Sequence, residues 1–253
     1  MVDIHSHILP GIDDGAQTME QSIEMLAIAA ASGTTDIVAT PHANGEVRFD
    51  AERVEKLFQD LSDRSGGSVT IHLGCDFHLN YGNLRNALEN PTKYTINHRQ
   101  YLMVELPDII ALASVKKAIN QLIDVRVVPV ITHPERNRSL QPQLGELERW
   151  VAEGACVQVT AQSLLGRFGH LAQHAADSLM NANLVHFIAS DAHDCVDRTP
   201  DLSVAREYVS NRYGSSRADA LFIHNPSAVL GGDPLPDSKN TSKKKPSRRI
   251  FGR

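Results

Sequence analysis

The chain opens with a β-strand pattern that runs directly into a histidine pair, VDIHSHILPGIDDG at positions 2–15. Side chains two positions apart in an extended strand point to the same face, so His5 and His7 present two imidazoles together. Asp14 follows in a turn that contains Pro10 and Gly11. Two imidazoles beside a carboxylate are a donor set for a divalent metal ion. Taken alone, the pattern fits a surface histidine pair equally well.

Further apolar runs of strand length follow, and segments with helical periodicity separate them. The expected strands span residues 2–4, 36–39, 69–73, 101–106, 126–131, 155–159 and 184–189. Helices are expected near residues 18–33, 54–61, 115–122, 144–154, 165–181 and 203–212. The runs are apolar throughout, which is typical of parallel strands covered on both faces. This alternation predicts an α/β fold with parallel strands inside and helices outside, and favours a closed barrel over an open doubly wound sheet.

The length and composition are those of one large α/β domain. The chain has 253 residues, and 42% of them are hydrophobic, which is ample for a core. No apolar run approaches the ~20 residues of a membrane span and no signal-peptide pattern is present, so we expect a soluble, cytoplasmic protein. The three cysteines lie far apart without a C-x-x-C pair, which argues against a disulfide framework. Glycine-rich nucleotide-binding motifs are absent from the sequence.

Polar side chains stand at the carboxyl ends of six of the seven expected strands, and the strand at 155–159 lacks them. In parallel barrels this rim is where functional sites are built. A lone histidine in such a position is more often a hydrogen-bonded loop residue. A set of charged groups at six strand ends argues for a shared site, because buried charges need partners. The candidate metal ligands are His5, His7, Asp14, His42, Asp76, Glu105, His133, Asp191 and His193.

This donor set narrows both the metal and the chemistry. Imidazole and carboxylate groups without a thiolate suit Mn, Fe or Zn. Nine ligands are too many for one ion, so we expect two or three ions, two of them ~3.5–4 Å apart and bridged by Glu105 or Asp191. Such a cluster lowers the pKa of bound water and clamps the attacking and leaving oxygens of a displacement at phosphorus. We therefore expect phosphoester hydrolysis.

Arginines close to two of these strand ends support a phosphate substrate. Arg136 follows His133, and Arg198 follows His193. The planar guanidinium group pairs with phosphate oxygens, although each arginine alone fits a surface position as well. Weaker candidates for the same role are Arg138, Arg48 and Asn44. A cysteine-dependent tyrosine phosphatase is excluded, because no cysteine has an arginine six positions later.

Four motifs resemble those of the PHP (polymerase and histidinol phosphatase) superfamily: DIHSHILPGIDDG at 3–15, ATPH at 39–42, HPER at 133–136 and SDAH at 190–193. Within it, residues 1–232 are similar to the bacterial manganese-dependent protein-tyrosine phosphatases of capsule and exopolysaccharide operons. The resemblance implies a PHP-type distorted (β/α)7 barrel and a Mn²⁺ cluster held at the nine positions given above. Asp76 stands where this family usually has Glu, and His78 where it usually has Arg.

The resemblance also implies an activity and a partner. We expect a protein-tyrosine phosphatase that acts on an autokinase of polysaccharide synthesis, with Arg136 and Arg198 on the phosphoryl oxygens and Mn²⁺ favoured over Fe or Zn. One alternative is a phosphoesterase for a small phosphomonoester such as histidinol phosphate, or for a nucleic-acid 5′ end. Another is a non-catalytic metal-binding module. The acidic balance of the chain weighs against nucleic acid, and the oligomeric state is not predicted.

The C-terminal residues differ in composition from the rest of the chain. Residues 238–253 carry seven basic and no acidic side chains, whereas the whole chain has 25 basic and 30 acidic ones. We expect residues 1–232 to form the phosphatase domain and residues 233–253 to be a disordered basic tail. The alternative is a tail that contacts anionic membrane lipid or an acidic partner.

Overall fold

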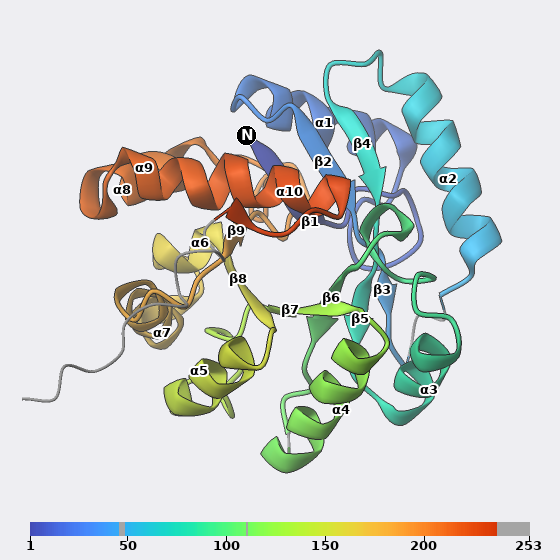
Figure 1. Cartoon of the computed structure of the whole chain (residues 1–253). Helices are drawn as coiled ribbons and strands as arrows, with labels where there is room; N and C mark the ends of the chain where they lie inside the picture. Colours follow the sequence, from blue (N-terminus) through green and yellow to red (C-terminus); the bar gives the residue numbers. More distant parts are fainter. Residues whose placement is uncertain (46–48, 110, 237–253) are drawn as a thin grey trace, which may run out of the picture.

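The computed structural model describes residues 1–45, 49–109 and 111–236. Parallel strands form the centre, and helices pack around them (Figure 1). One sheet has the order β1-β2-β4, formed by Val2–Ser6, Asp36–Ala39 and Thr70–Leu73. The other has the order β3-β5-β6-β7-β8-β9, formed by His42–Ala43, Asp76–His78, Tyr101–Glu105, Val128–Thr132, Cys156–Thr160 and Phe187–Ala189. Neighbouring strands pair in parallel, which confirms the predicted α/β class.

After two of the expected strands, 36–39 and 69–73, the chain passes from one sheet to the other. Thr40 and Pro41 separate β2 from β3, and Gly74 and Cys75 separate β4 from β5. Pro41 has no backbone N–H, so the ladder of β2 cannot continue through it. At the opposite edge the sheets meet in an isolated parallel bridge between Ser6 and Ala192. The strands thus form two sheets joined at this bridge, in place of one continuously hydrogen-bonded barrel.

Helices form in each region where the sequence predicts them. The α-helices are α1 (Met19–Ala31), α2 (Ala51–Arg64), α3 (Tyr81–Glu89), α4 (Leu112–Asp124), α5 (Leu144–Ala152), α6 (Ala161–Leu164), α7 (Gly169–Asn181), α8 (Ser203–Tyr213), α9 (Ser215–Asp219) and α10 (Asn225–Gly231). A 3-10 helix, η1 (Ile96–His98), and a π-helix, η2 (Ala220–His224), complete them. The predicted start of the 165–181 helix is wrong, because Gly166 and Gly169 adopt φ angles of 78° and 84°. Such left-handed conformations interrupt a helix, so α7 begins only at Gly169.

Side-chain caps explain where the first helices begin. The Thr18 side chain accepts a hydrogen bond from the backbone N–H of Gln21 at the start of α1. The Asp50 side chain accepts from the backbone N–H groups of Glu52 and Arg53 at the start of α2. These bonds satisfy N–H groups that have no partner inside the helix, which fixes the point where each helix leaves the preceding loop.

A buried apolar cluster fills the interior below the carboxyl ends of the strands. Ile4, Val38, Met103, Val130 and Phe187 belong to it. Side chains alternate along a strand, so the next side chain on the same face of β6 as Met103 is that of Glu105, at the strand end. In β1 the register with β2 shifts between Asp3 and Ser6. The apolar cluster therefore supports the polar strand ends from below.

The last described residues pack against this interior. Leu235 is only 6% exposed, and the Tyr101 hydroxyl donates to the backbone carbonyl of Asp233 over 2.7 Å. The rest of the predicted tail, residues 237–253, lies outside the described residues. Across the described ranges, no helix is both long enough and apolar enough to cross a membrane.

Candidate metal centre

The candidate ligands gather at or just beyond the carboxyl ends of β1, β2, β4, β6, β7 and β9. They are His5 in β1, His42 in β3, Asp76 in β5 and Glu105 in β6, with His7, Asp14, His133, Asp191 and His193 in the loops that follow strands. Seven of them form three overlapping groups whose donor atoms lie within 4.8 Å of one another. Chain segments up to about 190 positions apart meet here, as the parallel arrangement of the strands requires.

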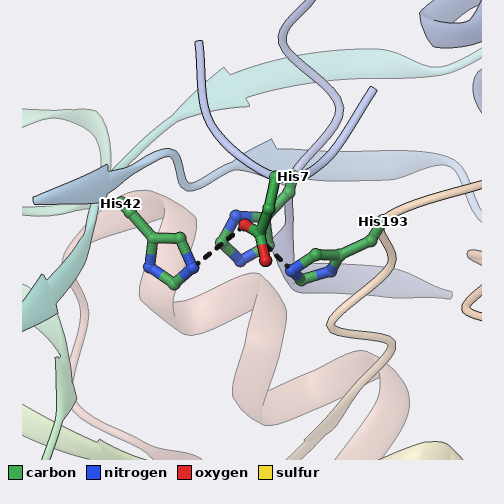
Figure 2. Close-up of side chains that lie close together, drawn as sticks. His7, His42 and His193 are labelled. Atoms are coloured by element: carbon green, nitrogen blue, oxygen red, sulfur yellow. Dashed lines mark ion pairs between the residues drawn. The ribbon is translucent and has the colours of Figure 1, made fainter. Parts of the chain in front are cut away.

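The outer group consists of His7, Asp14, His42 and His193. Figure 2 shows the three histidines around a common point. Asp14 Oδ1 lies 3.3 Å from His42 Nε2 and 3.5 Å from His193 Nε2. The Asp14 side chain is 65% exposed, whereas the His193 side chain is 7% exposed. This group therefore forms the solvent-facing side of the centre.

The inner group consists of His5, His7 and Asp76, all fully or almost fully buried. The Nε2 atoms of His5 and His7 face each other at 3.4 Å. His5 Nε2 lies 3.6 Å from Asp76 Oδ2. Asp191 Oδ1 lies 3.5 Å from His5 Nε2 and 3.6 Å from His7 Nε2, so this carboxylate completes the group.

The third group consists of His42, Asp76 and Glu105. His42 Nδ1 lies 3.3 Å from Asp76 Oδ2 and 3.7 Å from Glu105 Oε2. His133 reaches the same side, with its Nε2 atom 4.0 Å from Glu105 Oε1. Each pair of groups shares one member, namely His7, His42 or Asp76. Adjacent groups with shared members are the arrangement expected for a cluster of more than one ion.

The donor atoms fit divalent cations. Both carboxylate oxygens of Asp76 are buried without a hydrogen-bond partner among the described residues. A buried carboxylate without hydrogen-bond donors is costly even beside imidazoles, and a bound cation lowers that cost. The donors are imidazole nitrogens and carboxylate oxygens, the mixture that suits Mn, Fe or Zn. Asp76 reaches both neighbouring histidines although its side chain is shorter than that of Glu.

The charges of the cluster are strongly coupled. Burial lowers the pKa of His5, but the carboxylates of Asp76 and Asp191 outweigh burial and raise it to about 9. Burial likewise opposes a charged His42, while Asp14 and Asp76 raise its pKa to about 11. Hydrogen bonds from His193 and His42 hold the pKa of Asp14 well below its usual value. A metal ion needs neutral imidazoles, so its binding displaces the protons that these histidines retain in its absence.

Two side chains that the sequence did not single out orient these histidines. Asp13 accepts from His7 Nδ1 over 2.9 Å, and also from the backbone N–H groups of Gly15 and His42. Gln158 Oε1 accepts from His5 Nδ1 over 3.1 Å. In each case the outer bond leaves Nε2 directed at the cluster, which is how residues beyond the ligands tune a metal site. In the sequence, these two roles are marked only by a second aspartate, Asp13, in the turn and by the amide of Gln158 within the apolar run 155–159.

The turn that carries Asp13 also requires a glycine. A Cβ atom at Gly15 would lie 2.1 Å from the backbone oxygen of His7. Ala16 N donates to this same oxygen over 3.0 Å. The turn thus folds back directly onto the His7 backbone, and this close approach brings Asp13 and Asp14 to the imidazoles.

Both predicted phosphate-binding arginines border the cluster. The guanidinium groups of Arg136 and Arg198 contact Oδ2 of Asp191, with Arg198 Nη2 at 2.6 Å. Each arginine side chain is 26% exposed. His133 and Asp191 themselves have positive φ angles of 33° and 52°. Strained backbone of this kind persists where surrounding contacts hold it, and it is concentrated at functional sites.

The weaker candidates lie further out. Arg138 is exposed, Asn44 is half-buried after β3, and Arg48 lies outside the described residues. His78 Nδ1 lies 3.4 Å from Glu105 Oε2, at the rim of the third group. The hydrogen bond with Glu105 raises the pKa of His78.

Comparison with known proteins agrees with this architecture. CapC of Staphylococcus aureus is 34% identical over 202 residues, which is 78% of this chain and 79% of CapC. The tyrosine-protein phosphatase YwqE of Bacillus subtilis is 34% identical over 223 residues, which is 85% of this chain and 86% of YwqE. A crystal structure from the pair YwqE of Bacillus subtilis and CpsB of Streptococcus pneumoniae, described as unique metal-dependent tyrosine phosphatases, superposes with a TM-score of 0.86 at 31% identity. The superposition covers 93% of this chain and 96% of that one.

The family model for capsular polysaccharide synthesis proteins CpsB/CapC matches residues 1–231. This match spans the metal-ligand candidates and both arginines. It confirms the resemblance drawn from the four sequence motifs. The chain belongs to the CpsB/CapC family of capsular polysaccharide synthesis proteins.

Proposed function

We propose that the chain is a metal-dependent protein-tyrosine phosphatase. The observation that carries the proposal is the contact of Arg136 and Arg198 with Asp191, a member of the histidine and carboxylate cluster. Guanidinium groups bind phosphate oxygens, and the cluster offers the donors that bind divalent cations. A phosphate-binding pair beside such a cluster supports phosphoester hydrolysis more directly than metal storage. The relatives YwqE and CpsB are named tyrosine-protein phosphatases, which supports the same class.

We propose that the nine candidate ligands hold two or three Mn²⁺ ions, with Fe or Zn as the alternatives. Ions bound there would supply Lewis acidity and lower the pKa of water, so that a nucleophile is available near neutral pH. Asp13 and Gln158 fix the tautomers of His7 and His5, so the ligand atoms are oriented before any ion binds.

The two arginines bind and orient the phosphoryl group in this proposal. Asp191 Oδ2 accepts from both guanidinium groups, and Arg198 Nη2 also donates to the Asp191 backbone carbonyl over 3.1 Å. Other N–H groups of the two arginines would then bind the phosphoryl oxygens. Their positive charges neutralise the negative charge that accumulates on the phosphoryl oxygens in the transition state. Since both arginines are fixed by Asp191, little reorganisation is needed when the substrate arrives.

The proposed substrate is a phosphotyrosine of the autokinase that regulates polysaccharide synthesis. The family description, capsular polysaccharide synthesis, supports this choice. We place the reaction in the cytoplasm, where ATP-dependent kinases phosphorylate their substrates. Residues 1–232 are proposed as the catalytic domain, and the family match to residues 1–231 supports that boundary.

The test is hydrolysis of p-nitrophenyl phosphate and of a phosphotyrosine peptide by the full chain. Activity is expected to disappear after exhaustive chelation, to return with Mn²⁺, and to be lost in a His5→Ala/His7→Ala variant. His174→Ala is the matched control, because His174 is exposed on α7 away from the cluster. Full turnover after chelation, or in the double variant, would contradict the proposal.

A substrate panel and elemental analysis separate the alternatives. Equal kcat/KM for histidinol phosphate and for the phosphotyrosine peptide would remove the tyrosine specificity and favour the small-substrate alternative. Bound metal at the expected stoichiometry without turnover of any phosphoester would favour the non-catalytic module.

A further inference from the structure

The segment after β8 supplies no candidate metal ligand, but it contacts both arginines. Phe168 is half-buried in the turn between α6 and α7. Its ring centroid lies 4.3 Å from Cζ of Arg136 and 5.9 Å from Cζ of Arg198. A guanidinium group within about 6 Å of an aromatic ring centroid is attracted by the negative face of the ring. Phe168 is therefore placed to interact with both positive groups of the proposed phosphate site.

The turn that presents Phe168 is well defined. Gly166 and Gly169 flank it with φ angles of 78° and 84°, which glycine adopts without strain. The backbone N–H groups of Gly166 and Gly169 donate to the carbonyls of Ser163 and Gly166, over 3.1 and 3.0 Å. The Arg167 N–H donates to the Gln162 carbonyl over 3.0 Å. These bonds fix the backbone from which the Phe168 ring projects.

The short helix α6, just before this turn, is hydrogen-bonded to the residues that precede Arg136 and Arg198. The Ser163 hydroxyl donates over 2.7 Å to Oε1 of Glu135, the residue before Arg136. The Gln162 amide donates over 2.8 Å to the backbone carbonyl of Asp197, the residue before Arg198. The position of Phe168 relative to the two guanidinium groups is thus set by direct bonds rather than by a free loop.

The ring and Asp191 restrain different parts of Arg136. Asp191 Oδ2 contacts a terminal nitrogen at the edge of the guanidinium group, while Phe168 lies over Cζ. A planar cation held at an edge and over its centre has little rotational freedom left. Less entropy is then lost when its remaining N–H groups bind an anion.

We propose that Phe168 is a positioning residue that holds the Arg136 guanidinium, and more weakly that of Arg198, in the orientation that binds the phosphoryl group. This inference rests on the proposed function, because it assigns the arginines to phosphate. It gives the turn that follows β8 and α6 a part in the site, although this turn carries no candidate metal ligand.

The experiment compares Phe168→Leu, Phe168→Tyr and Phe168→Trp in the Mn²⁺-loaded full chain. Measured quantities are the dissociation constant for inorganic phosphate, KM and kcat for p-nitrophenyl phosphate, metal content and the thermal midpoint. Phe168→Leu is expected to weaken phosphate binding and raise KM about threefold to tenfold, with metal content unchanged. Phe168→Tyr and Phe168→Trp keep an aromatic face and should restore binding. Leu171→Ala is the control, because Leu171 is 72% exposed at the start of α7.

A double-mutant cycle with Arg136→Ala separates positioning from general packing. If Phe168 acts through Arg136, most of the effect of Phe168→Leu on phosphate binding disappears in the Arg136→Ala background. Wild-type phosphate binding by Phe168→Leu, or an equal loss in both backgrounds, would overturn the proposal. Should Phe168→Leu lower the thermal midpoint, Phe168→Met offers a second non-aromatic side chain of similar size. Phosphate binding without phosphoester turnover in the wild type would defeat the proposed function while this comparison still tests Phe168.

Discussion

Gln158 and His5 face each other in the closed interior, with Gln158 Oε1 3.1 Å from His5 Nδ1. Both residues are fully buried. An amide oxygen can only accept, so this contact places the proton of a neutral His5 on Nδ1 and leaves Nε2 for the cluster. β8, which no candidate ligand follows, therefore determines the tautomer of His5 through Gln158.

Replacing Gln158 should weaken metal binding without removing a ligand. Gln158→Leu keeps a similar volume but leaves His5 Nδ1 without its acceptor. The affinity for Mn²⁺ is expected to fall about 10–100-fold, the usual effect of losing such a supporting contact. Titration against a competing chelator measures this change. Gln59→Leu, at an exposed position of α2, serves as the control, and unchanged affinity in a folded Gln158→Leu protein would argue against the assigned tautomer.

Removal of Arg198 should impair turnover and spare the metal cluster. Arg198→Ala removes one of the two guanidinium groups on Asp191, and kcat/KM for p-nitrophenyl phosphate is expected to fall about 10²–10³-fold. Metal content by elemental analysis should stay at the wild-type value, because arginine is not a ligand. Arg138 is exposed two positions after Arg136, so Arg138→Ala should keep the wild-type kcat/KM and metal content. Loss of metal together with activity would mean that Arg198 acts on the cluster itself.

His186 should weaken the fold at acidic pH. Burial lowers its pKa to about 4, with the positive charge of Arg217 adding to the effect, and its Nδ1 accepts from Val157 N over 3.1 Å. Between about pH 6.5 and 4 the unfolded chain therefore binds a proton that the folded chain excludes. Stability falls as pH decreases through this window, by up to about 3 kcal/mol for this one group.

The variant His186→Gln isolates that contribution, because glutamine can accept from Val157 N without titrating. Urea unfolding at pH 7 and pH 4.5 should show a smaller loss of stability for His186→Gln than for wild type. His174→Gln, on the exposed side of α7, should follow the wild-type curve. Parallel curves for His186→Gln and wild type would show that the folded chain does not keep His186 neutral in this pH window.

Deletion of residues 238–253 should leave turnover unchanged. In the part of the chain that the structure describes, this end packs through Leu235 and through Asp233, whose carbonyl accepts from the Tyr101 hydroxyl. Both residues precede the deleted segment. Equal kcat and thermal midpoint for the full and shortened chains are the expected outcome, and a drop in either would contradict it. Co-sedimentation with phosphatidylserine vesicles, with phosphatidylcholine vesicles as control, distinguishes lipid contact by the basic tail from a purely solvated tail.

Sequence periodicity placed the strands well because the buried strands are continuous apolar runs bounded by polar residues. It could not show that the chain continues after β2 and β4 as β3 and β5 in the other sheet, since that continuation depends on which neighbour each segment pairs with. Pro41 and Gly74 mark these points only in retrospect. Periodicity also merged the 165–181 segment into one helix, because it gives no weight to the left-handed φ angles of Gly166 and Gly169.

The candidate ligands could be found because each stands at a strand end, and parallel strands bring their carboxyl ends to one side of the fold. The sequence alone thus determined the fold class, the set of polar residues that gather at this side, and the family. The orienting contacts depend on tertiary structure: Gln158 lies 153 positions from His5, and Phe168 meets Arg136 where Ser163 of α6 donates to Glu135. Spacing along a chain encodes which face a side chain takes, whereas the partner it meets there is decided by how distant segments pack.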